Sequence, residues 1–211
     1  HSTIPTSDAF LLHSNPTSNR TIYLDFTGMD IANTAWASGV GWSSAQTTMG
    51  PYDADGDPAS FSDAERQNII DTWSNVAEDF SMLDVDVTTE EPSQSRIDRS
   101  SFSDTTYGTR ALITSGSNVI VDSCGCGGVA YLGTFDAYGV PSGYYTPAFA
   151  FASAWFNGKI ISDIVSHEVG HNLGLQHDGF GTDTYYLGRS GWAPIMGAGY
   201  YEPLVQWSNG E

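Results

Sequence analysis

Basic residues are scarce in this 211-residue chain. Seven lysines and arginines stand against 25 aspartates and glutamates, and Lys159 is the only lysine. The formal net charge of −18 argues against nucleic acid and anionic membranes as partners, because both need a basic surface. The excess of carboxylates favours solubility or calcium binding, or is simply a solvated acidic surface.

Long apolar runs are also missing. No window approaches the roughly 18 consecutive apolar residues of a membrane span, so we expect no membrane segment. No charged-then-apolar leader opens the chain, which indicates that a signal peptide has been removed or was never included. The sequence also lacks a Gly-x-Ser-x-Gly elbow, a phosphate-binding loop and a dinucleotide fingerprint. Its 40% hydrophobic residues are typical of a packed globule, and we expect one domain over residues 1–211.

Cysteine is nearly absent. The two cysteines, Cys124 and Cys126, lie in the segment Ser-Cys-Gly-Cys-Gly-Gly. Their spacing and the flanking glycines favour a tight disulfide loop in a secreted protein. A pair of free thiols that bind metal is the alternative.

The most informative segment reads His-Glu-Val-Gly-His-Asn-Leu-Gly-Leu-Gln-His-Asp and begins at His167. His167 and His171 are four residues apart, so on a helix they project from nearly the same face. Gly174 can adopt a positive φ and turn the chain, which brings His177 back as a third zinc ligand. Glu168 lies beside the first ligand, where its carboxylate could deprotonate a water held by the metal. Three protein ligands and one open position describe a catalytic zinc site.

This pattern resembles the signature of the metzincin clan of zinc endopeptidases. Ala-Pro-Ile-Met-Gly at residues 193–197 looks like the methionine turn of that clan, with Met196 as a packing floor under the imidazoles. The aspartate after the third histidine, Asp178, is most similar to the adamalysin (reprolysin) branch, and we expect it to hydrogen-bond backbone or a neighbouring imidazole. Some metzincins carry a tyrosine two residues after the methionine, but here that residue is Ala198.

The resemblance implies an α+β fold: a twisted, mixed five-stranded sheet with two long helices. An upper lobe to about residue 175 would be followed by a small lower lobe over about 176–211, which contains the methionine turn. Few residues follow that turn, so we expect the native chain to continue past Glu211. Metzincins are usually secreted as zymogens, and secretion is expected here.

The hydrophobic pattern predicts the main elements. Alternation predicts strands at 21–26, 84–89 and 110–114, and apolar runs predict strands at 129–135 and 147–152. Helical spacing and a capping box of Ser62 with Glu65 predict a helix at 63–80, and the metal helix is expected at 160–173. A surface loop is expected at 38–61. In metzincins the element that corresponds to 129–135 is the antiparallel edge strand that borders the cleft, and such an unpaired edge can accept a substrate peptide. The edge residues expected here are Val129, Ala130, Tyr131, Leu132 and Gly133.

A second metal site is suggested by Asp53-Ala-Asp55-Gly-Asp57, whose carboxylates alternate as in a calcium loop. The glycine position differs from that of an EF-hand, and Asp63 or Glu65 would be the additional ligands. The alternative is an acidic turn without an ion.

We therefore expect a secreted, monomeric zinc endopeptidase that hydrolyses protein or peptide substrates, with or without glycans, and that uses one catalytic Zn²⁺ and, if the acidic loop binds it, Ca²⁺. Two alternatives stay open. One is a zinc-bearing module that binds peptide or glycopeptide without turnover, and the other is a zinc hydrolase of a non-peptide amide.

Overall fold

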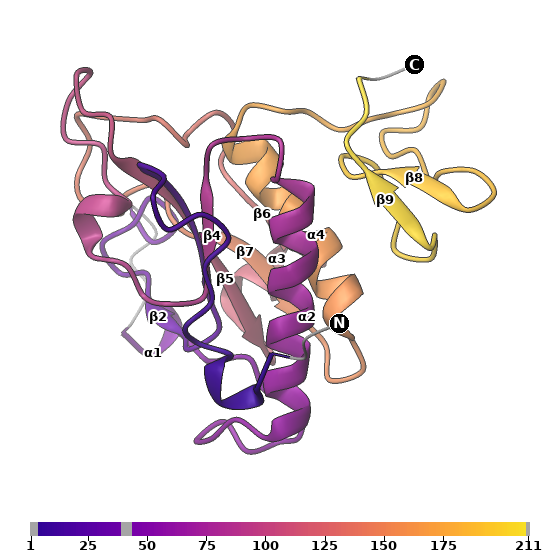
Figure 1. The fold of residues 1–211 in the computed structure, drawn as a ribbon, viewed down its shortest axis with the longest axis horizontal. Coiled ribbons are helices and arrows are strands. Elements are labelled where there is room, and N and C mark those ends of the chain that lie inside the picture. The colour runs from indigo at the N-terminus through magenta and orange to yellow at the C-terminus, as the bar shows by residue number, and fades with distance from the viewer. Residues whose placement is uncertain (1–3, 39–43, 210–211) are drawn as a thin grey trace.

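The computed structural model describes residues 4–38 and 44–209. Its main sheet has five strands in the order β4-β1-β5-β7-β6 (Figure 1). The three central strands and β4 are parallel, and β6 pairs antiparallel with β7 at one edge. The strands are β1 (Arg20–Asp25), β4 (Asp86–Thr88), β5 (Tyr107–Ser115), β6 (Gly128–Val129) and β7 (Ala148–Ala152). This α+β architecture with a mixed five-stranded sheet confirms the predicted fold class.

Two long helices, α2 (Asp63–Asp79) and α4 (Gly158–Asn172), pack against each other. The predicted capping box begins α2: Ser62 accepts a hydrogen bond from the Glu65 amide, and the Glu65 carboxylate accepts one from the Ser62 amide. At the start of α4, the Asn157 side chain accepts a hydrogen bond from the Ile160 amide. Within the described residues, no helix is long and apolar enough to span a membrane.

Side chains alternate along the strands and so point to both faces of the sheet. Both faces are buried. In β5, Ala111 and Ile113 join the cluster that contains the apolar side chains of α2 and α4, whereas Leu112 packs on the opposite face. That second face is covered by shorter elements, namely α3 (Val119–Cys124), β2 (Met29–Asp30) and β3 (Thr48–Met49). The remaining elements are α1 (Ser44–Thr47), β8 (Trp192–Pro194), β9 (Leu204–Gln206) and the 3₁₀ turns η1 (Thr6–Asp8) and η2 (Gln94–Arg96).

The predicted strand at 129–135 is wrong over most of its length. The edge strand β6 is only Gly128–Val129, and Ala130, Tyr131, Leu132 and Gly133 lie outside it. The reason is competition from α4: the Gly133 amide donates to the His171 carbonyl at 2.8 Å, and the Asn172 side chain donates to the Tyr131 carbonyl at 2.9 Å. These bonds turn the segment away from the sheet and fasten it to the end of the metal helix.

The segment predicted as a surface loop at 38–61 is also more structured than expected. It contains α1 and β3, and Met49 and Tyr52 are almost fully buried. Residues 39–43 lie outside the described residues. The predicted strand at 84–89 shortens to β4, whereas β1, β5, β7 and both long helices confirm their predictions to within a few residues.

The C-terminal segment forms a separate two-stranded sheet, β8 paired with β9, on the α4 side of the molecule (Figure 1). Trp207, just after β9, returns to the helices. Its ring packs edge-on against Phe80, and its indole nitrogen donates to the Asp79 carbonyl at 2.6 Å. The division into upper and lower lobes stays a prediction.

Candidate metal centre

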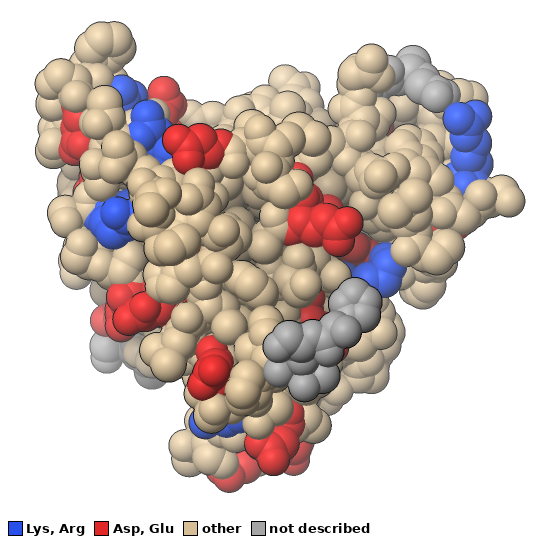
Figure 2. Space-filling model, in the orientation of Figure 1, with Lys and Arg blue, Asp and Glu red and all other residues tan. Residues whose placement is uncertain are grey.

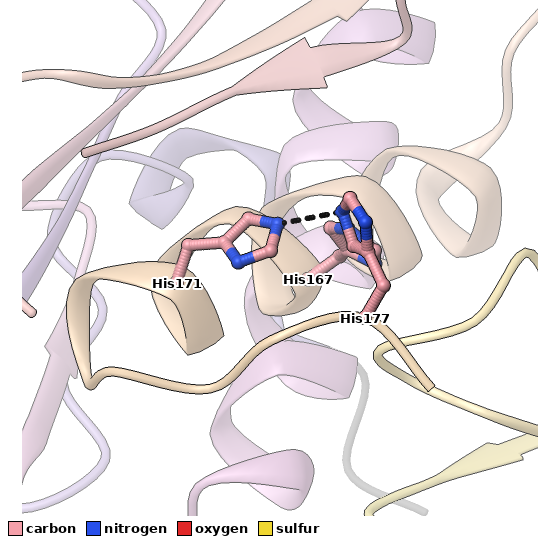
Figure 3. A group of neighbouring side chains, drawn as sticks. All are labelled: His167, His171 and His177. Atoms are coloured by element: carbon pink, nitrogen blue, oxygen red, sulfur yellow. Dashed lines mark hydrogen bonds between the residues drawn. The ribbon is translucent and has the colours of Figure 1, made fainter. Parts of the chain in front are cut away.

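Three imidazoles meet beside the carboxyl end of α4 (Figure 3). His167 and His171 project from successive turns of α4, and His177 comes from the segment that follows the helix. One nitrogen of each ring lies within 4.8 Å of one nitrogen of each of the others. The Nε2 atoms of His171 and His177 are 3.0 Å apart, close to the roughly 3.3 Å expected for two ligands on one tetrahedral zinc.

The ring orientations of the helical histidines are fixed by main-chain carbonyls. The Nδ1 atom of His167 lies 2.8 Å from the Ile195 carbonyl oxygen, and that of His171 lies 2.8 Å from the Leu175 carbonyl oxygen. A carbonyl only accepts, so each Nδ1 carries the proton and each Nε2 presents a lone pair to the centre. Burial lowers the pKa of His167 to about 4 and lowers the pKa of His177. Neutral rings of this kind are what zinc requires.

Glu168 lies between α4 and the edge strand. It is 6% exposed, and its Oε2 atom is buried without a hydrogen-bond partner among the described residues. Burial raises the pKa of its carboxyl to about 8, and a neighbouring cation would lower that pKa. A buried carboxylate oxygen without a partner, next to three convergent imidazoles, fits a site that holds a metal ion and a polarised water.

The turn after the helix follows from its glycine. Gly174 has a φ of 93°, which a side chain would penalise, and its amide donates to the His171 carbonyl. Met196 is 4% exposed, and its sulfur lies 2.5 Å from the position that a Cβ on Gly170 would occupy. Met196 therefore packs directly beneath the metal helix.

The side chain of Asp178 was expected to hydrogen-bond backbone or a neighbouring imidazole. Its Oδ2 atom is buried and, among the described residues, has no hydrogen-bond partner. Its main chain makes the contacts instead: the amide donates to the Met196 carbonyl at 2.8 Å, and the carbonyl accepts from the Tyr186 amide at 2.7 Å. The residue closes a loop more than it supports a ligand.

Sequence reasoning missed three residues around the histidines. The Tyr185 ring packs on His177 with centroids 4.1 Å apart. Asn172 is buried and joins α4 to both β5 and the segment after β6, because Thr109 donates to its side-chain oxygen at 2.7 Å. Gly128 is a contact point for Glu168. Two of these residues could have been found from the sequence, because Asn172 lies within the histidine segment and Gly128 within the Gly-Gly pair. No sequence pattern pointed to Tyr185.

The acidic loop is assembled differently from its sequence pattern. Oxygen atoms of Asp53, Asp55 and Glu65 lie within 4.8 Å of one another, and Asp57 is not part of this group. Both Glu65 oxygens already accept hydrogen bonds, one from the Ala54 amide and the other from Ser62. Calcium at this loop stays a prediction.

Cys124 and Cys126 form a disulfide, with Cα atoms 5.1 Å apart. The bond closes the turn between α3 and β6, where Gly125 has a φ of 59°. It holds the start of the edge strand in place and leaves no thiol for a metal at this position.

The comparison with protein families agrees with this geometry. The model of the family "Metallo-peptidase family M12B Reprolysin-like" matches residues 72–178, half of the chain, and ends just after the third histidine. A search of curated proteins found no match. The matched segment contains the second half of α2, the central strands β5 and β7, the edge strand and the three histidines. The chain therefore belongs to the reprolysin-like metallopeptidases of family M12B.

Proposed function

We propose that this metallopeptidase is a secreted, zinc-dependent endopeptidase in which His167, His171 and His177 hold the metal. The observation that carries the proposal is the convergence of three imidazoles beside a buried carboxylate without a partner among the described residues. When bound, zinc would polarise the scissile carbonyl and acidify the attacking water. Membership in a peptidase family supports a protein or peptide as substrate.

Proton transfer, orientation of the histidines and binding of the substrate are the tasks of other groups in the chain. Glu168 takes the proton of the attacking water at its carboxylate and delivers it to the nitrogen of the departing amine. The Ile195 and Leu175 carbonyls keep the helical histidines in the tautomer that turns Nε2 inward. The outward-facing edge of β6 holds the substrate main chain as an added strand.

Secretion is supported by the disulfide between Cys124 and Cys126, because disulfides persist mainly in oxidising compartments. The acidic composition and the relatedness to reprolysins agree with a protein that works outside the cell. We propose that the enzyme acts as a monomer on exposed, extended segments of its substrates.

The test is Glu168→Gln, which keeps the shape of the side chain and removes the base. We expect casein cleavage to fall by about 100- to 10,000-fold, while zinc stays near one ion per chain by metal analysis. Glu78→Gln removes an exposed carboxylate of α2 and is the matched control, with unchanged activity. Treating the wild-type enzyme with a zinc chelator should abolish cleavage, and restoring zinc should recover it. Cleavage by Glu168→Gln at the native rate would refute the mechanism.

A further inference from the structure

A groove with a cavity volume of about 700 Å³ lies where the loops before α2 and α4 approach the start of the edge strand. Both loops are at the lower end of the helices in Figure 1. Among its lining residues are Asp53, Cys126, Gly127, Phe151, Trp155 and Phe156. We call it the Trp155 groove, because that ring is its most exposed aromatic wall, 69% exposed, and stands at 89° to the ring of Phe156.

The Trp155 groove continues from the catalytic centre. Gly127 belongs to its lining and directly precedes Gly128, against which the Glu168 side chain packs. A Cβ on Gly127 would lie 3.7 Å from Ile164, one helical turn before Glu168 on α4. The groove therefore begins about one turn of α4 away from the general base.

The register of the edge strand shows where a substrate peptide can pair. The Phe151 amide donates to the Gly127 carbonyl at 2.9 Å, and Gly128 faces Ala150 in the register of β6 with β7. In an antiparallel ladder, hydrogen-bonded and non-hydrogen-bonded pairs alternate. Gly128 is thus in a non-hydrogen-bonded pair, and its amide and carbonyl point away from β7, toward an added strand.

The direction of that added strand decides whether the residues before or after the scissile bond lie in the groove. Antiparallel pairing is the more stable arrangement, and β6 runs from Gly128 toward Val129. An antiparallel peptide then runs from Val129 past Gly128 toward Cys126. With the scissile bond beside Glu168, residues that follow the bond enter the Trp155 groove after about two to three positions, at 3.4 Å per residue.

The negative charge of the groove indicates which kind of substrate side chain it would bind. Asp53 lines it, and the carboxylates of Asp55 and Glu65 lie within 4.8 Å of the Asp53 carboxylate. No lysine or arginine is among the described lining residues. Arg66, in the first turns of α2, is held by the Phe61 carbonyl and lies over the Phe10 ring. Figure 2 shows acidic side chains gathered at this end of the molecule.

We propose that the Trp155 groove binds the substrate chain on the carboxyl side of the scissile bond and prefers a lysine or arginine there. A cationic side chain suits both features of the wall, since it is attracted by the face of a tryptophan ring and by a carboxylate. The inference rests on the proposed endopeptidase function and adds the position and charge of a preferred substrate residue.

The test uses a peptide that the wild-type enzyme cleaves, prepared with arginine, alanine or glutamate at the third position after the scissile bond. A shortened peptide ends one residue after that bond and cannot reach the groove. We expect kcat/KM to be about tenfold higher for the arginine peptide than for the glutamate peptide. Trp155→Ala and Asp53→Asn should each remove most of this preference and leave the shortened peptide unaffected.

Phe102→Ala is the matched control, because Phe102 is 76% exposed and its ring packs on Tyr138, away from the groove lining. Equal loss on the full-length and shortened peptides in Trp155→Ala would overturn the inference, as would a preference for arginine only before the scissile bond. Cleavage of the shortened peptide reports on the catalytic centre alone, without the groove. If no peptide is cleaved at all, the proposed function fails, and the groove assignment fails with it.

Discussion

Gly128 leaves space that Glu168 fills. A Cβ on Gly128 would lie 2.7 Å from both Cγ and Oε1 of Glu168 and 2.6 Å from the Phe149 carbonyl oxygen. A Cβ atom essentially never makes contacts this short with a non-bonded heavy atom. The Phe149 carbonyl oxygen cannot move aside without disturbing β7. The absence of a side chain at one position of the edge strand thus sets the place of Glu168, the proposed general base.

Gly128→Ala should therefore displace the Glu168 carboxylate. We expect kcat to fall by about 100-fold, because misplacing a catalytic group by an ångström has effects of that order, while zinc content stays near one ion per chain. Steady-state kinetics and metal analysis on the same sample check both points. Gly50→Ala is the control, since a Cβ there meets nothing within 4 Å. Full activity in Gly128→Ala would contradict this account.

Tyr185 should matter for metal retention through its ring. The ring packs on His177, 4.1 Å away between centroids, and so restricts the one of the three proposed ligands that lies outside α4. Removing such support around a metal ligand costs roughly 10- to 100-fold in affinity. We expect Tyr185→Ala to weaken zinc binding by about tenfold in a chelator competition assay, whereas Tyr185→Phe keeps the ring and the affinity. Equal zinc affinity of the two variants would refute the packing role.

Asp79 makes stability depend on pH. Burial raises the pKa of its carboxyl to about 6 despite the hydrogen bond from Ser166. The folded state then keeps a proton that the unfolded state releases, so the free energy of unfolding falls as pH rises from about 4 to 6. Asp79→Asn should remove this loss and stabilise the protein by about 1–3 kcal/mol at pH 7, with no gain at pH 4.

The measurement for Asp79 is denaturant unfolding of variant and wild type at both pH values. Asp71→Asn, an exposed carboxylate on the same helix, is the control and should change stability little. A stabilisation by Asp79→Asn that is equally large at pH 4 would show that burial of the charge is not its cause.

Gly170 and Met196 should be energetically coupled. A Cβ on Gly170 would lie 2.5 Å from the Met196 sulfur and 3.2 Å from the Trp207 ring. We expect Gly170→Ala to lower the free energy of unfolding by about 1–3 kcal/mol, the usual cost of overpacking. Combining it with Met196→Ala should cost less than the sum of the single changes, because the shorter side chain relieves the contact. Additive thermal unfolding data would contradict the coupling.

The sequence was most predictive where one local pattern determines the structure. The helical spacing around Ile69 and Val76, the capping box of Ser62 with Glu65, and the histidine segment each specify their own conformation. These patterns predicted both helices, the sheet class and the convergence of the three histidines.

What the sequence could not predict depends on partners far away in the chain. The apolar stretch after Val129 favours a strand, but the bond from Asn172 to the Tyr131 carbonyl, 41 residues away, ends that strand early. The position of Tyr185 against His177 and the hydrogen bond from Trp207 to Asp79, 128 residues apart, follow from tertiary packing. The Trp155 groove combines three distant loops and has no local signature.

The hydrogen bond from the Asp178 amide to the Met196 carbonyl closes a loop over the 17 residues from 179 to 195. The entropic cost of closing a loop rises only slowly with its length. Residues at the tip of this loop can therefore be inserted, deleted or exchanged while the three histidines keep their positions. The histidine site and the tip of this loop are thus separable parts. New sequence could be grafted between 179 and 184 without redesigning the histidine site.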